Sequence, residues 1–363
     1  MSTIAVNAIT NAAGGNTATI NGMTPTADSL QGFRNRLINS DMRIDQRNAG
    51  ASVTNQASRI YTLDRWAYVA SQSSKFTVQQ TPSATETGYA TRVAAGFTNY
   101  LAVTSSSAYS VGSSDYFVIQ QRIEGYNSAD LAWGTASAKT VTLSFWVYSS
   151  LTGTFGGALQ NNAADRSYPF TYTVSAANTW EQKTVTIAGD TSGTWLTTNG
   201  LGIVLQFGLG LGSTYSGTAG AWAAANYLSV TGATSVVGTS GATFYITGVQ
   251  LEAGSVATPF ERRPYSTELQ LAQRYYYQYT APTVIGQNGG NIGSGYSTYF
   301  GLSIPFKVSM RTNPTILQNF GVSTDSAGTI TYNANEEGYG LNHGNMSGLY
   351  SYISGTFKVS AEL

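Results

Sequence analysis

The sequence predicts an all-β protein whose centre is a jelly-roll β-sandwich, and three observations support this fold class. Between residues 60 and 262, short segments rich in β-branched and aromatic residues alternate apolar and polar positions, as half-buried strands do. Glycine, serine and asparagine separate these segments, which is typical of turns. Only one segment of the 363 residues has a helical period, which disfavours a parallel α/β sheet.

The amino-terminal segment differs from the rest in composition. Residues 1–30 are rich in Thr, Asn, Ala and Gly, and a segment of this kind buries too little apolar surface to fold alone. We expect it to order against another chain or a docking partner. Two short strands are predicted at residues 37–39 and 42–44, and residues 1–59 together form the predicted docking segment.

The predicted jelly roll extends from residue 60 to residue 264. Its clearest strand places Val141, Leu143, Phe145 and Val147 on one face and alternate residues on the other. The predicted strands are residues 61–63, 75–80, 100–104, 116–123, 140–148, 167–174, 180–187, 202–207 and 243–251. Residues 208–225 form a glycine-rich segment without a phosphate-loop pattern, so we expect a long loop that is mobile or shaped for a ligand.

One short helix is predicted over residues 265–276. Pro264 precedes it, Ser266 is the expected N-cap, and an apolar face begins at Leu269. Residues 265–363 are predicted to form a carboxy-terminal domain that is otherwise rich in β-strands. Its predicted strands are residues 275–277, 296–304, 315–318, 329–332 and 348–359.

Composition excludes several classes of function. Lys+Arg and Asp+Glu are both 18, so the basic surface that nucleic acids require is missing. There is no cysteine, which excludes thiolate metal sites and cysteine nucleophiles, and His343 is the only histidine. We expect no cofactor and no metal site. No run of about 20 apolar residues predicts membrane insertion, and the first residues do not form a signal peptide.

Low charge predicts association of chains. Charged residues make up 10% of the sequence, against about 25% in ordinary soluble domains. A neutral sandwich with open sheet edges is prone to aggregate, and an obligate oligomer closes those edges. A neutral monomeric sandwich is the alternative.

Three segments together resemble tail-fibre and minor tail proteins of tailed bacteriophages. They are GFRNRLIN, MRIDQR and YTLDRW in residues 32–66; VIQQRIEG and VTLSFWV in residues 118–147; and GVQLEAGSVATPFE with RRPY and QRYY in residues 248–276. The resemblance covers roughly residues 30–280, and the third segment is its most specific part. It implies a central jelly-roll region similar to carbohydrate-binding modules, a homotrimer, and docking to tail, baseplate or adaptor proteins through residues 1–30.

The resemblance also implies a function. It predicts a virion protein, made in the host cytoplasm, that attaches the phage to host surface polysaccharide. A capsid or tail decoration protein that binds no receptor is one alternative, and a polysaccharide depolymerase is another. Hydrolysis needs two carboxyl groups about 5 to 10 Å apart, and the sequence places no such pair, so we expect a protein that is not an enzyme.

Sugar binding requires aromatic rings that stack on sugar faces, together with planar polar groups. Trp195 and Trp222 flank polar, glycine-rich loops and are the predicted platforms, with Tyr215, Asp165 and Arg166 as accompanying groups. Most tryptophans of a β-sandwich pack in its core, which is the alternative for both. A structural calcium ion stays open by analogy with carbohydrate-binding modules, although no Asp-rich loop supports it.

The carboxy-terminal domain supplies a second predicted binding surface. Its receptor-tip candidates are Tyr296, Tyr299, Tyr332, Tyr339 and His343. Tyrosine gives a large amphipathic contact area at low entropic cost, although these rings are equally expected in a trimer core. We expect adhesion to map to residues after about 280, with the sandwich loops as the second choice.

The third resemblance segment contains a charged cluster. Glu252, Glu261, Arg262 and Arg263 gather where the sandwich ends and the predicted helix begins. A network of carboxylates and guanidinium groups is predicted to hold the sandwich to the next domain. The role of these residues is therefore expected to be structural.

Overall fold

The computed structural model describes residues 32–81, 83, 85–287, 300–324, 329–344 and 350–363. The chain divides into two compact units, one ending at Arg262 and the other beginning at Arg263. The predicted docking residues 1–30 lie outside the described residues. In the described part, no helix is both long and apolar enough to cross a membrane.

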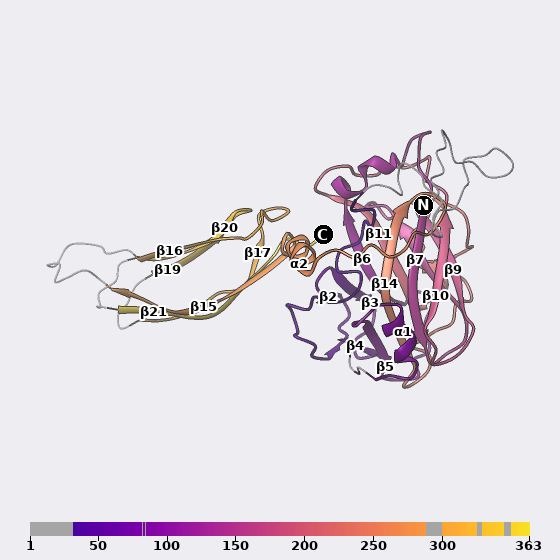
Figure 1. Cartoon of the computed structure of the whole chain (residues 1–363), viewed down its shortest axis with the longest axis horizontal. Helices are drawn as coiled ribbons and strands as arrows, with labels where there is room; N and C mark the ends of the chain where they lie inside the picture. The colour runs from indigo at the N-terminus through magenta and orange to yellow at the C-terminus, as the bar shows by residue number, and fades with distance from the viewer. Residues whose placement is uncertain (1–31, 82, 84, 288–299, 325–328, 345–349) are drawn as a thin grey trace, which may run out of the picture. The chain divides into compact units, whose positions relative to one another are not determined.

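The described part of the first unit is built on two six-stranded antiparallel sheets (Figure 1). In spatial order, the first sheet consists of β1 (Val53–Thr54), β4 (Phe76–Gln80), β5 (Leu101–Ser105), β14 (Thr243–Ala253), β7 (Val141–Ser149) and β10 (Glu181–Ile187). The second consists of β2 (Arg59–Leu63), β3 (Trp66–Ala70), β6 (Tyr116–Glu124), β11 (Leu201–Leu211), β8 (Gly153–Gln160) and β9 (Ser167–Val174). All nine strands predicted in this region are present.

The connectivity of eight of these strands is that of a jelly roll, which confirms the predicted fold class. In chain order the eight are β5, β6, β7, β8, β9, β10, β11 and β14. The first sheet places them in the order first, eighth, third, sixth, and the second in the order second, seventh, fourth, fifth. Strands β4 and β3 then extend the two sheets beside β5 and β6. Both β3 and the glycine-rich β8 are absent from the predicted set.

The core lies between the inner faces of the two sheets. In β7 the predicted inner residues Val141, Leu143, Phe145 and Val147 are each 0% exposed. Strand β11 contributes Phe207, whose ring lies edge-on to Phe145 with centroids 5.1 Å apart. Complete burial of one such side chain contributes about 1.5 to 3 kcal/mol, so alternation of this kind fixes which face of each strand points outward.

Residues 33–59 belong to the sandwich unit, and the two strands predicted at residues 37–39 and 42–44 do not form. Asn39 and Met42 have positive φ angles of 54° and 61°, which interrupt an extended strand. The segment instead packs into the core, where Leu37 and Met42 are 0% exposed. The Asn39 amide donates to the carbonyl oxygens of Ile44 and Asp64, so side-chain bonds replace a strand ladder.

The described residues contain two α-helices where one was predicted. Helix α1 (Tyr89–Ala94) is only six residues long, too short for a detectable period. Helix α2 (Tyr265–Gln273) confirms the predicted helix, but Pro264 is its N-cap and Ser266 lies within its first turn. Proline is suited to the start of a helix because its fixed φ costs no hydrogen bond there.

The second unit packs two small sheets around its own core. One sheet pairs β15 (Tyr276–Gln287), β21 (Tyr350–Ser360), β17 (Thr315–Gln318) and β18 (Gly321–Thr324). The other has the order β16 (Phe300–Pro305), β20 (Gly338–Gly344), β19 (Thr329–Ala334). The five predicted strands are present, whereas β18 and β20 were not predicted.

Candidate functional site

The outward face of the second sheet carries a row of carboxamide side chains. In β6, Ile119 points into the core, so its neighbour Gln120 points outward. Gln120 lies opposite Gln206 of β11, and Gln206 lies opposite Ala158 of β8. Gln160 follows Ala158 by two residues on the same face. Three adjacent strands thus present glutamines side by side.

A cavity of about 220 Å³ opens over these side chains, and we call it the amide groove. Its lining residues are Arg59, Val69, Tyr116, Gln120, Arg122, Gln160, Asn161, Asn162, Ala164, Leu201, Val204, Gln206, Tyr215, Asn226 and Leu228. Pockets that enclose a drug-sized ligand are about 300 to 1,000 Å³. The amide groove is therefore sized for part of a longer ligand.

The glycine-rich loop, residues 212–231, forms one wall of the amide groove. Its strands β12 (Ser216–Gly217) and β13 (Ser229–Val230) pair in parallel, and β13 packs against β8, β9 and β11. Close approach requires glycines in the sheet: a Cβ added to Gly156 or Gly208 would lie 2.5 or 2.8 Å from the Ser229 hydroxyl. The loop begins after Leu211 rather than at residue 208, because β11 is longer than predicted.

The amides of the groove form a hydrogen-bonded chain with one member left out. Gln206 Nε2 donates to Gln160 Oε1 over 3.2 Å, and Gln160 Nε2 donates to Asn226 Oδ1 over 2.7 Å. Gln120 is 3% exposed, and its Nε2 has no hydrogen-bond partner among the described residues. A buried donor without an acceptor costs about 1 to 3 kcal/mol. Gln120 therefore offers an unused donor at the floor of the groove.

Two tyrosines supply aromatic surface beside the amides. Tyr116 of β6 and Tyr215 of the loop lie edge-to-face with ring centroids 5.1 Å apart, and both are partly exposed. Tyr215 is thus the one predicted sugar-contacting residue that lines the amide groove.

The predicted platforms Trp195 and Trp222 lie outside the groove lining and pack with Trp133. The three ring centroids are 4.8 to 5.4 Å apart, all edge-to-face. Each indole N–H donates to a backbone carbonyl, those of Ser192, Ala188 and Lys139 respectively. Trp195 and Trp222 stay half-buried, so this tryptophan triad stabilises loops and offers only part of two rings to solvent.

Arg166 and Asp165 also form contacts that hold loops together. Arg166 forms two hydrogen bonds, of 2.8 and 2.7 Å, with Asp190, whose side chain is 2% exposed. The hydrogen bond and charge of Asp190 raise the pKa of Arg166. Asp165 accepts a 2.7 Å hydrogen bond from Asn161, a residue of the groove lining. These contacts hold the groove's rim rather than face its interior.

Among the predicted receptor-tip residues, the structure describes the side chains of Tyr332 and Tyr339, and both pack against the core of the second unit. Tyr339 is 1% exposed and stacks on Phe357 with centroids 4.2 Å apart, because it faces the core of the second unit. Tyr332 packs partly buried against the same core. His343 lies in β20 opposite Phe300 and Ile330. Tyr296 and Tyr299 lie outside the described residues.

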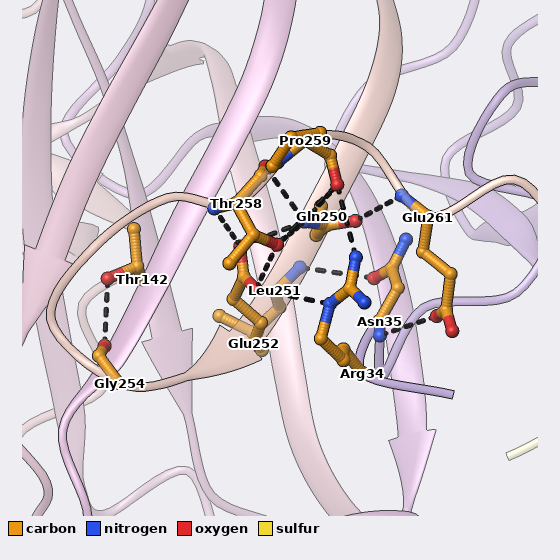
Figure 2. Close-up of polar contacts among 10 residues, drawn as sticks. All are labelled: Arg34, Asn35, Thr142, Gln250, Leu251, Glu252, Gly254, Thr258, Pro259 and Glu261. Atoms are coloured by element: carbon orange, nitrogen blue, oxygen red, sulfur yellow. Dashed lines mark hydrogen bonds and ion pairs between the residues drawn. The ribbon is translucent and has the colours of Figure 1, made fainter. Parts of the chain in front are cut away.

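The charged cluster of the third resemblance segment is internal to the sandwich unit, apart from Arg263. Figure 2 shows Glu252 accepting hydrogen bonds from Gln250, from the Thr258 N–H and from the Thr258 hydroxyl, at 2.6 to 2.8 Å. Arg34 approaches the same carboxylate to 3.8 Å. Glu252 is 1% exposed, so this network encloses its charge.

The same network holds the amino-terminal segment to the end of β14. The Asn35 N–H donates to Glu261, and Asn35 Oδ1 accepts from the Leu251 N–H (Figure 2). Arg262 contacts the rings of Phe97 and Phe260, whereas Arg263 pairs with Glu268 inside the second unit. The network around Glu252 and Glu261 therefore lies within the sandwich unit, and the predicted link to the next domain stays a prediction.

The glutamines of the groove were not predicted as site residues. One signal was available, since Gln120 and Gln121 directly follow the apolar run Phe117, Val118 and Ile119. No group of three or more His, Asp or Glu side chains able to hold a metal ion occurs in the part of the chain that the structure describes.

Comparison with known proteins gives only distant similarities. No protein-family model matches the chain, and no curated protein does. Among solved structures, a CBM4 structure is 16% identical over 43% of this chain and 71% of its own, with a TM-score of 0.26. A family 11 carbohydrate-binding module from Clostridium thermocellum is 10% identical over 56% of this chain and 96% of its own, with a TM-score of 0.27.

A tailspike protein 4 domain of bacteriophage CBA120, described as enzymatically active, is also similar in structure. It is 10% identical over 53% of this chain and 20% of its own, with a TM-score of 0.30. Similarities of this size carry no argument about function. The jelly roll of this chain is established by the order of its own strands.

Proposed function

We propose that this chain is a non-enzymatic attachment protein of a tailed phage virion, and that its amide groove binds host surface polysaccharide. The observation that carries the proposal is the Nε2 of Gln120, which has no partner among the described residues and lies in a cavity lined by five other carboxamides. Carboxamides donate and accept hydrogen bonds in one plane, which suits adjacent sugar hydroxyls. The sequence resemblance to tail-fibre proteins supports the phage context.

The composition of the groove favours binding over hydrolysis. Glycoside hydrolysis uses two carboxyl groups, and no Asp or Glu is among the groove's lining residues. Tyr116 and Tyr215 instead provide ring edges and faces against which a sugar packs. The groove therefore has the groups that hold a glycan and lacks the pair that cleaves one.

A glycan-binding measurement on the full chain tests this function. Wild-type protein is titrated against a panel of bacterial capsular polysaccharides and O-antigens, alongside Gln120→Leu and Tyr215→Ala. We expect at least one glycan to bind and both variants to weaken it. Binding that both variants leave unchanged would place the site elsewhere, and release of reducing ends during incubation would favour a depolymerase.

The proposed fibre context includes a homotrimer and docking of residues 1–30 to tail, baseplate or adaptor proteins. Light scattering and cross-linking of the full chain measure the number of chains in the oligomer. Pull-down of tail proteins with and without residues 1–30 measures the docking. A decoration protein is the second candidate, and it predicts that labelled full-length chain does not coat host cells.

A further inference from the structure

The lining of the amide groove carries charge of one sign. Arg59 and Arg122 contribute two guanidinium groups, and no carboxylate accompanies them in the lining. The whole chain has 18 basic and 18 acidic residues. The positive charge is therefore a local property of this groove and does not follow from a basic composition.

The two arginines flank the row that contains Gln120. Arg59 of β2 lies opposite Val69, and Val69 lies opposite Val118, two residues before Gln120. Arg122 follows Gln120 by two residues on the same face of β6. Rows two residues apart are separated by about 7 Å along a strand. A ligand placed over Gln120 therefore lies between the rows of the two arginines.

Arg59 has no competing partner in the described part of the chain. It is exposed, and no hydrogen bond or ion pair engages its side chain there. Arg122 is half-buried and has an interaction of its own in the described part of the chain, so Arg59 supplies the open guanidinium group. Two acidic residues lie close to lining residues: Glu124 follows Arg122 by two residues, and Asp165 bonds to Asn161. Neither of these carboxylates is among the residues that line the cavity.

We propose that the amide groove selects a glycan that carries carboxylate groups, such as a polyuronate. This inference rests on the proposed carbohydrate binding and adds its charge class. A guanidinium group binds a carboxylate through two parallel hydrogen bonds, while the carboxamides take the neighbouring hydroxyls. A neutral glycan gains only the hydrogen bonds between its hydroxyls and the carboxamides.

The test uses the full chain and matched pairs of polymers. Alginate, polygalacturonate and hyaluronate are each compared with their carboxyl-reduced forms, which keep the backbone and lose the charge. Dextran sulfate against dextran measures general attraction to anions. Arg59→Gln and Arg122→Gln change the groove, and Arg36→Gln is the matched control, because Arg36 pairs with Asp130 and does not line the groove.

We expect at least one polyuronate to bind about tenfold or more tightly than its reduced form and to dissociate as salt is raised. Arg59→Gln should weaken it about two- to fivefold, as for an exposed ion pair, and Arg36→Gln should not. Equal binding of acidic and reduced forms would overturn the charge selection while leaving carbohydrate binding intact. If the chain bound dextran sulfate more tightly than dextran, and Arg36→Gln and Arg59→Gln weakened that binding equally, the charge selection would be non-specific attraction to anions. Binding of no polymer at all would reject the proposed function itself.

Discussion

Gln120 and Gln121 are neighbours in β6, yet one carboxamide is fully bonded and the other is not. Gln121 Oε1 accepts from the Ile38 N–H and its Nε2 donates to the Ile38 carbonyl, both at 2.8 Å. Gln120 points to the opposite face and its Nε2 has no partner among the described residues. Gln121 fastens the amino-terminal segment, and Gln120 remains available to a ligand.

This difference predicts that a Gln→Leu substitution affects the free energy of unfolding differently at the two positions. Gln121→Leu should lower the free energy of unfolding by about 1 to 3 kcal/mol, because it leaves the Ile38 N–H and carbonyl unpaired. Gln120→Leu removes an unsatisfied donor, so stability should be unchanged or rise by about 1 kcal/mol, while glycan binding weakens. Urea unfolding of both variants measures the difference, and equal destabilisation would contradict the assignment.

The tryptophan triad should contribute mainly to stability. Trp222→Ala removes ring contacts with Trp133, Trp195 and Tyr168 and should cost about 2 to 4 kcal/mol, somewhat less than for a fully buried ring. Thermal and urea unfolding provide the measurement. Trp222→Phe is the control that retains a ring and should recover part of the loss. Loss of glycan binding without loss of stability would instead indicate that the Trp222 ring stacks on a sugar.

The Glu252 network predicts a structural role for the resemblance segment. Glu252→Ala removes the carboxylate that accepts from the Thr258 N–H and hydroxyl, and one of the acceptors of the Gln250 amide. It should cost about 3 to 5 kcal/mol, as for a broken buried pair. Arg36→Met, which breaks the more exposed pair with Asp130, should cost about 1 kcal/mol or less. A stable Glu252→Gln protein that fails to adsorb to cells would show a ligand role instead.

Glu86 predicts loss of stability in acid. Burial acts to raise its pKa, but hydrogen bonds from Arg92, its own backbone N–H and Trp180, together with the charge of Arg92, outweigh burial and hold the pKa below its ordinary value of 4.5. The unfolded chain therefore takes up this proton first as the pH falls, and the stabilisation present above about pH 4.5 is lost through the folded-state pKa. Urea unfolding between pH 6 and pH 3 should show this slope, and Glu86→Gln should make it shallower. An unchanged slope in the variant would exclude Glu86 as a source.

Alternation and turn residues were sufficient to predict nine strands of the sandwich, because each inner face buries every second side chain. The prediction failed where side-chain bonds replace ladders, as at Asn39, and where glycine removes the alternation, as in β8. Tyr215, predicted as a sugar-contacting residue, lines the groove. Trp195 and Trp222 do not, and their indole N–H groups bond to loop carbonyls. The row of Gln120 and Gln206 depends on register between distant strands, which residue spacing alone does not reveal.

Hydrogen–deuterium exchange of the full chain, with and without the glycan that binds it most tightly, measures whether the amide groove is the glycan-binding site. We expect slower exchange in residues 212–231 and in β6, because the loop and Gln120 line the same groove. Protection confined to residues 263–363, with the loop unchanged, would contradict it and place the glycan on the second unit.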